Sequence, residues 1–325
     1  MTQQGDDADA DARNAPDDGM TPIPGGTFTM GSAEFYPEEA PVREVEVDGF
    51  RMDTHPVTNE EFAQFVDATG YTTLAERPPD PGDYPGADPA DLVSGSAVFA
   101  SPDGPVDLRD PTQWWEYVPG ADWRHPHGPE SSIEGKTEHP VVHVAYEDAV
   151  AYATWAGKAL PTEAQWERAA RGGLEGKRFV WGDEHVPDGR LMANTWQGEF
   201  PHENTALDGY EGTSPVGAFP ANGFGLYDAA GNVWEWTRDW YSDDPTAGES
   251  DTPACCTPTN PRGVSAGASV DPRDPTQMPR KVLKGGSHLC APNYCLRYRP
   301  AARYPEPVDT STTHVGFRCV RPNER

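Results

Sequence analysis

The stretch WAGKALPTEAQWERAARGG, from Trp155 to Gly173, is the part of the sequence that most strongly decides the fold. Thr162, followed three residues later by Gln165, is a capping-box pattern typical of a helix start. The pattern continues as an apolar stripe and then a glycine pair, at Trp166, Ala169, Ala170, Gly172 and Gly173. We therefore predict a short helix that begins after Thr162 and ends before the glycines.

Other elements are predicted upstream of this helix. A capping box at Thr58 starts a helix that Gly70 closes, and another helix runs from about Glu147 to Ala156. Alternating side chains predict two short strands, one within IPGGTFTMGS (23–32) and one around Val45 and Val47. These elements form scaffold, and we assign them no chemistry.

The composition predicts an irregular fold. The 325 residues include 33 Gly and 35 Pro, about one residue in five, and ten Trp that argue for a packed interior. We expect an α+β, loop-rich domain with little regular secondary structure. It spans residues 21–325 after a disordered acidic tail at 1–20, and residues 242–279 form a long surface loop.

The net charge of −28 makes a nucleic-acid partner improbable, because phosphate binding needs Lys and Arg. This acidic charge indicates either a solvated surface or an acidic rim that attracts a basic peptide. The sequence shows no apolar run that could span a membrane and no secretory signal. With five Cys, this favours reduced thiols and a cytoplasmic location.

Two cysteines are the candidate reactive groups. Cys290 and Cys295 lie five residues apart, and Pro292 between them predicts a turn that brings both sulfurs together. The pair could form a disulfide, provide half of a zinc site with His288 nearby, or bind a soft ion such as copper(I). The CxxxxC spacing alone does not decide among these three uses.

The surrounding motifs resemble the formylglycine-generating enzymes, also called sulfatase-modifying factors. The resemblance runs from IPGGTFTMGS to GFRCVRP (316–322), and WAGKALPTEAQWERAARGG and GNVWEW (231–236) belong to the wider fold superfamily. The fold implied is irregular and related to C-type lectin-like folds. The feature that resembles the true formylglycine generators is the cysteine pair after Gly285, Gly286 and Ser287.

The resemblance implies a copper(I)-dependent oxidation of a client cysteine to Cα-formylglycine. The client would be a polypeptide, such as a sulfatase, with a C-x-P-x-R-like motif, and the reaction would consume dioxygen and an external reductant. Cys290 and Cys295 would be the copper ligands, with Cys295 the candidate for exchange with the client thiol. Ser287 and Trp234 match residues beside the active site, although a turn hydrogen bond and a core position explain them equally well.

The resemblance also implies two structural calcium sites, unless their carboxylates only cap turns. The first set is Asn194 and Asp208 with the carbonyls of Thr195 and Tyr210. The second set is Asp228 and Glu235 with the carbonyls of Gly231 and Val233. Oxygen ligands of this kind suit a hard cation.

The remaining charged and thiol groups are expected to be structural. Salt bridges are the commoner fate of an Arg run such as Arg297, Arg299 and Arg303. Secreted relatives carry further disulfides, but here Pro300, Ala170 and Ala153 stand at such positions, which leaves Cys319 a free buried thiol. Cys255 and Cys256 are interpreted as loop thiols, with copper recruitment as the alternative.

Two other classes share part of this pattern. Sulfoxide synthases of the same fold carry non-haem iron on a His set in an additional helical domain. The nine His here form no HxxxHxE-like cluster. A non-catalytic binding module would be expected to lose one thiol of the pair, and both thiols are present.

Overall fold

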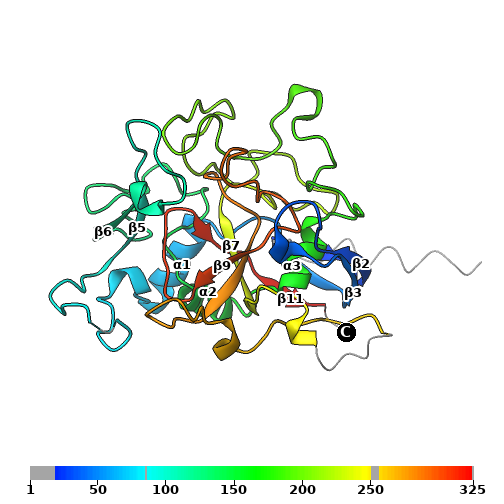
Figure 1. The fold of residues 1–325 in the computed structure, drawn as a ribbon, viewed down its shortest axis with the longest axis horizontal. Helices are drawn as coiled ribbons and strands as arrows, with labels where there is room; N and C mark the ends of the chain where they lie inside the picture. The colour runs from blue at the N-terminus through cyan, green and yellow to red at the C-terminus, as the bar shows by residue number, and fades with distance from the viewer. Residues whose placement is uncertain (1–18, 85, 250–255, 324–325) are drawn as a thin grey trace, which may run out of the picture.

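The computed structural model describes residues 19–84, 86–249 and 256–323. Its three α-helices and several small sheets are embedded in long loops (Figure 1). The helices are α1 (Asn59–Thr69), α2 (Tyr146–Trp155) and α3 (Glu163–Ala170). This confirms the predicted α+β, loop-rich class. Residues 1–18 of the predicted acidic tail (1–20) and Cys255 lie outside the described residues.

The strands form four small sheets. The three-stranded sheet has the order β1-β4-β11 and contains β1 (Met20–Ile23), β4 (Phe50–Asp53) and β11 (Val320–Pro322). The four-stranded sheet has the order β10-β7-β8-β9 and contains β10 (Val315–Gly316), β7 (Trp234–Trp240), β8 (Arg280–Lys284) and β9 (Tyr304–Pro307). Two hairpin-like pairs complete the set: β2 (Gly26–Met30) with β3 (Arg43–Val47), and β5 (Gly95–Phe99) with β6 (Trp115–Pro119).

The predicted helices and strands are confirmed. Thr58 and Thr162 both cap their helices through the expected reciprocal hydrogen bonds, and Gly70 closes α1 in the left-handed conformation with φ 68°. The predicted strands are β2 and β3, which pair antiparallel. The chain enters the sheet at Met20, one residue before the predicted domain start.

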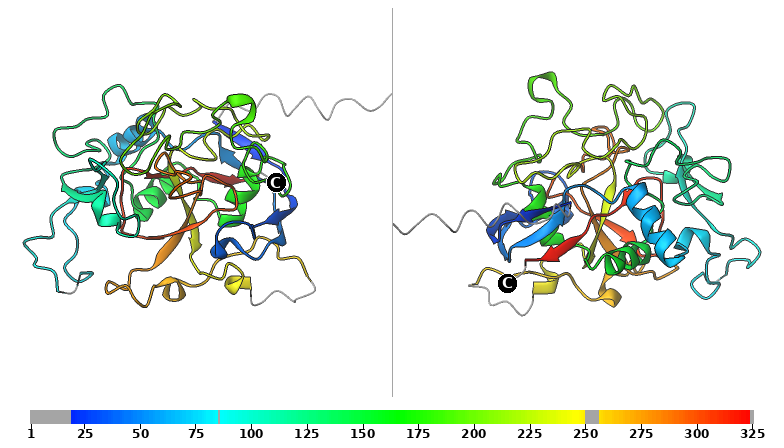
Figure 2. Two further views of the ribbon diagram at one scale, coloured as in Figure 1. Left: turned by 45° about the horizontal axis from the view of Figure 1, so that its top comes forward. Right: turned by 180° about the vertical axis from the view of Figure 1, so that it is seen from behind.

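One hydrophobic core joins the helices to the sheets. From behind, α1 and α2 lie side by side (Figure 2), where Phe65 contacts Tyr152 with ring centroids 5.7 Å apart. Trp166 of α3 is 1 % exposed and packs in this core together with Cys290 and Cys295. The helix that the opening motif predicts therefore packs into the same hydrophobic core as the cysteine pair.

Long loops make up most of the described chain outside the α-helices and sheets. Between α3 and β7 the described chain forms only one 3-10 helix, η5 (Pro187–Gly189). The predicted surface loop at 242–279 carries the 3-10 helices η6 (Ala247–Glu249) and η7 (Ala266–Ser269) in its described parts. None of the described helices is long and apolar enough to cross a membrane.

A buried ion network ties α3 to the four-stranded sheet. The Nζ of Lys284 donates to Glu167 at 3.0 Å and lies 3.7 Å from Glu163, and the side chain of Lys284 is fully buried. Glu167 also accepts from Arg171 at 2.6 Å and from the backbone N–H of Gly31 at 2.8 Å. Removing one partner would leave the others charged inside the core.

We predict that Lys284→Met lowers the free energy of unfolding by about 3–5 kcal/mol, because it removes one of the cations that compensate the buried carboxylates Glu163 and Glu167. Denaturant unfolding measures this change. The matched control is Lys177→Met, whose ion pair with Asp183 is exposed and whose loss should leave stability almost unchanged. Equal midpoints for wild type and Lys284→Met would contradict this role.

Candidate functional site

The cysteine segment begins at a glycine turn directly after β8. Gly285 and Gly286 have φ values of 96° and 71°, the left-handed region that glycine tolerates best. A Cβ on Gly286 would stand 2.8 Å from the backbone nitrogen of Tyr298, and one on Gly285 would stand 3.0 Å from the Trp166 ring. The glycines therefore let this backbone pass closely over the core.

The two thiols meet at the end of this turn. Their Sγ atoms lie 3.1 Å apart, both cysteines are free, and Cys290 and Cys295 are 2 % and 8 % exposed. The Cys295 N–H donates to the Ala291 carbonyl at 2.8 Å, which closes the turn that Pro292 predicts. Among the described residues no three His, Cys, Asp or Glu side chains converge, so the zinc alternative lacks a third protein ligand.

The two thiols differ in acidity. Burial and the neighbouring sulfur raise the pKa of Cys290 well above its ordinary value. The hydrogen bond from Cys290 lowers the pKa of Cys295, and the nearby Arg297 guanidinium lowers it further. Cys295 is therefore the preferred thiolate and also the more exposed sulfur.

Ser287 and Trp234 both lie at the thiols. The Ser287 N–H points to the Cys290 Sγ at 3.4 Å, and its hydroxyl accepts from the Leu289 N–H at 3.2 Å. The turn hydrogen bond is thus present, and Ser287 also lines the cavity above the sulfurs. Trp234 is 4 % exposed, belongs to the core and forms part of the same wall.

An open cavity of about 440 Å³ lies over the thiols. Its walls are largely aromatic, contributed by Trp114, Trp115, Phe200, Trp234, Tyr294 and Tyr304. A second cavity of about 600 Å³ adjoins it at Ala97, which lines both. The second cavity is lined by the carboxylates of Asp80, Asp83, Asp91, Glu147 and Asp309.

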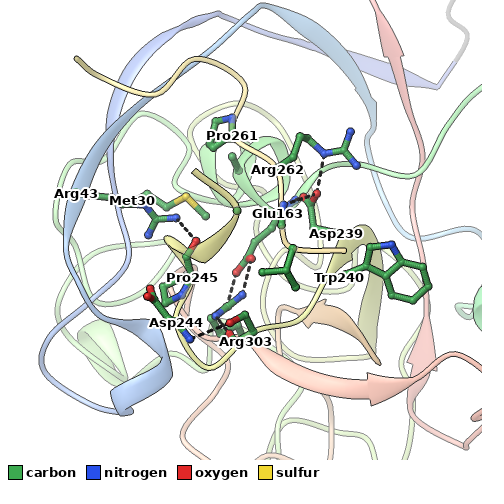
Figure 3. Close-up of a pocket in the computed structure, with 15 residues that line it drawn as sticks. Met30, Arg43, Glu163, Asp239, Trp240, Asp244, Pro245, Pro261, Arg262 and Arg303 are labelled. Atoms are coloured by element: carbon green, nitrogen blue, oxygen red, sulfur yellow. Dashed lines mark hydrogen bonds and ion pairs between the residues drawn. The ribbon is translucent and has the colours of Figure 1, made fainter. Parts of the chain in front are cut away.

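The Arg run after the thiols forms salt bridges, as predicted. Arg297 donates to Glu38 at 2.7 Å and lies 3.8 Å over the Tyr36 ring. Arg299 binds Glu39. Arg303 binds Glu163 of α3 at 2.8 Å, beside a hollow of only about 20 Å³ that holds little more than one water (Figure 3).

The first predicted calcium set has the donor chemistry that such a cation needs. The Asn194 amide donates to the Gly212 carbonyl at 2.9 Å, while its buried Oδ1 accepts no hydrogen bond among the described residues. The Asp208 carboxylate accepts from the N–H groups of Thr195 at 3.2 Å and Tyr210 at 3.1 Å. These residues fit a hard cation.

The second predicted calcium set fits less well. Both Glu235 oxygens accept from Arg318, at 2.7 and 2.8 Å, and one also accepts from the Trp166 indole at 2.6 Å. Asp228 is buried and accepts from the Gly217 N–H at 2.8 Å. Because Arg318 already neutralises Glu235, this set retains less charge for a cation than the first.

The sequence analysis did not identify the acidic residues that pair with the arginines after the thiols. Glu38 and Glu39 come from a 3-10 helix, η2 (Pro37–Glu39), about 260 residues before the arginines that they bind. Glu163 and Glu167 gave a usable signal, because acids four residues apart on an apolar helix face imply buried cations.

Cys319 is a free buried thiol, as predicted, and Cys256 is exposed.

Comparison with known proteins agrees with this geometry. Residues 5–323 match the family described as "Sulfatase-modifying factor enzyme 1-like domain". A formylglycine-generating enzyme of Mycobacterium tuberculosis is 58% identical over 93% of this chain and 97% of its own. A mouse protein named inactive C-alpha-formylglycine-generating enzyme 2 is 37% identical over 96% of this chain and 89% of its own.

A solved structure shows the same fold. PvdO from Pseudomonas aeruginosa superposes with a TM-score of 0.59 over 94% of each chain, at 24% identity, which bears on the fold alone. One relative in this family is named inactive, so family membership alone does not establish activity. The thiol pair is the feature of this chain that bears on activity. The chain belongs to the sulfatase-modifying factor family, the family of the formylglycine-generating enzymes.

Proposed function

We propose that this protein oxidises a cysteine of client polypeptides to Cα-formylglycine. The observation that carries the proposal is the pair of free cysteine sulfurs, 3.1 Å apart, beneath an open cavity of about 440 Å³. The 58% identity to an enzyme named for this activity supports it. The client segment that carries the reacting thiol would enter this cavity, because both cysteines line it.

The overall reaction balances with one dioxygen and one two-electron reductant. The client CH2–SH group, dioxygen, two electrons and two protons give an aldehyde, hydrogen sulfide and water. The carbon–sulfur bond breaks, a carbon–oxygen double bond forms, and dioxygen is reduced. The external reductant supplies the two electrons that the client does not.

Copper(I) fits the two thiols, since soft thiolates favour this ion. Cys290 and Cys295 would hold it, and the ion would supply the one-electron chemistry with dioxygen that side chains lack. The hydrogen bond from Cys290 and then the Arg297 guanidinium lower the pKa of Cys295, which favours its thiolate, and the Ser287 N–H donates to the Cys290 Sγ. The aromatic walls exclude water and fix the client thiol near the pair.

The client would be a sulfatase-like polypeptide with a C-x-P-x-R-like segment. The acidic neighbouring cavity supports a cationic partner rather than an anionic one. Cys290, Cys295 and Cys319 form no disulfide in the structure, and a reducing compartment such as the cytoplasm would keep these thiols available for the reaction.

We expect copper-loaded wild type, with dioxygen and reductant, to form an aldehyde in a peptide containing C-T-P-S-R, detected by mass and by hydrazine labelling. Cys290→Ser and Cys295→Ser should lower the rate at least about 100-fold, because each removes a thiol that acts on the reacting sulfur. Cys319→Ala is the control, since that buried thiol lies outside the cavity lining. Absence of aldehyde with wild type would refute the proposed function.

Copper binding can be measured separately from turnover. Titrating reduced protein with Cu(I) against a competing chelator should show one tight equivalent in wild type and in Cys319→Ala. Either Cys290→Ser or Cys295→Ser should lose it, because one thiolate and a hydroxyl bind a soft ion poorly. Tight binding that survives in both variants would place copper elsewhere.

We propose that Asn194, Asp208, Thr195 and Tyr210 hold a calcium ion, and that Asp228, Glu235, Gly231 and Val233 bind a second one less tightly. Excess calcium should then raise the melting temperature of chelator-treated protein, since ligands stabilise the state that they bind. Asp208→Asn should reduce this shift, whereas Asp107→Asn, an exposed control, should not. A melting temperature independent of calcium would contradict both sites.

A further inference from the structure

Tyr298 lies in the core close to the two thiols. It is 1 % exposed and belongs to the same core cluster as Cys290 and Cys295. Burial raises the pKa of Tyr298, and the charges of Cys290 and then Cys295 raise it further, so its hydroxyl lies within electrostatic reach of both sulfurs. Tyr298 does not belong to the lining of the cavity over the thiols. A client in that cavity would therefore not contact it.

The hydroxyl of Tyr298 meets a histidine that reaches the protein surface. The Tyr298 Oη and His185 Nε2 lie 3.0 Å apart, within hydrogen-bond distance. Partial burial lowers the pKa of His185, so its imidazole is neutral at pH 7 and can accept the hydroxyl proton at Nε2. His185 is itself exposed, so a proton on its ring can exchange with solvent. The buried phenol thus has a base that connects it to the outside.

Stacked aromatic rings continue from Tyr298 toward the surface. Phe179 stacks on Tyr298 with ring centroids 6.0 Å apart and an interplanar angle of 11°. Trp181 in turn stacks on Phe179, at 5.0 Å and 3°. Phe179 is buried, whereas Trp181 is half-buried and its indole N–H donates to the Glu184 carbonyl at 2.8 Å. The stack therefore joins the core beside the thiols to the surface.

This arrangement meets a requirement of the proposed reaction. A client over the cavity would cover the thiols, yet the reaction takes two electrons from an external reductant. Electrons cross short stacks of aromatic rings, and the phenol of tyrosine and the indole of tryptophan are readily oxidised. A phenol loses an electron far more easily when a hydrogen-bonded base takes its proton in the same step. Tyr298 has such a base in His185.

We propose that Tyr298 and His185 form a redox relay that carries electrons from a reductant at the surface to the two-thiol site. The inference rests on the proposed function, which supplies dioxygen as oxidant and an external reductant, here of the thiolate or ascorbate class. Tyr298 gives one electron to the oxygen-reducing site and its hydroxyl proton to His185 Nε2, which leaves a neutral phenoxyl radical and an imidazolium. The reductant then returns one electron through the Trp181–Phe179 stack, and the imidazolium returns the proton. Two such cycles deliver the two electrons of one turnover.

Metal-free protein tests the relay separately from turnover. A photo-oxidised ruthenium tris-bipyridine complex removes one electron from the protein, and EPR with ring-deuterated tyrosine identifies tyrosyl radicals above the background from surface tyrosines. Wild type should show a component that Tyr298→Phe lacks, because phenylalanine keeps the stacked ring and loses the hydroxyl. In His185→Gln this component should fall at least about 10-fold, because an amide accepts a hydrogen bond but not a proton.

Turnover of copper-loaded enzyme gives the second measurement. Tyr298→Phe should lower kcat/KM for the reductant at least about 10-fold, because the relay then lacks its oxidisable group. The KM for the client peptide should stay unchanged, as should the Kd of an inert peptide with serine in place of the target cysteine. A merely structural role of the hydroxyl would shift peptide binding and reductant kinetics together.

Tyr152→Phe is the matched control. It removes a hydroxyl from another tyrosine of the same core, one that stacks with Phe62, and should behave as wild type in both measurements. The absence of the Tyr298 component in wild type would overturn the inference, as would unchanged reductant kinetics in Tyr298→Phe. An equal loss in Tyr152→Phe would also overturn it, because altered core packing would then suffice. Failure of aldehyde formation in wild type, with the Tyr298 radical still formed, would refute the proposed function and leave Tyr298 and His185 as a redox-active pair.

Discussion

The position of the cysteine segment depends on two buried carboxylates of α3. Glu167 holds Lys284 at 3.0 Å, and Glu163 holds Arg303 through two contacts of 2.8 and 2.9 Å. Lys284 directly precedes the glycine turn, and Arg303 follows the last residues of the segment. The two ion pairs therefore fix both ends of residues 285–302 to one helix.

These ion pairs exist because each charge has a partner in the core. The cations lower the pKa of Glu163 below its ordinary value and that of Glu167 to about 2, even though burial opposes both shifts. Both carboxylates therefore stay charged, and the cost of burying them is offset only while the whole set is intact. A loop-rich segment with few regular hydrogen bonds gains in this way a fixed geometry for its thiols and for the cavity above them.

Local signals made the helices and the strands β2 and β3 predictable, whereas the elements and ion pairs that depend on long-range pairing were not predicted. Thr58, Thr162 and their capping partners lie within three residues of each other, so the sequence alone locates α1 and α3. Strand β8 was not predicted, because RKVLK becomes a strand only between β7 and β9. The cysteine pair stood out through its motif. The Arg318–Glu235 pair joins residues 83 apart, which no local pattern reveals.

The central claim is that the two-thiol cavity converts a client cysteine to an aldehyde with loss of its sulfur. The most direct measurement follows dioxygen uptake, sulfide release and aldehyde yield together, on one peptide and one enzyme preparation. The account predicts equal molar amounts of all three. Dioxygen uptake with peptide disulfide or sulfoxide as the product, and no released sulfide, would contradict it.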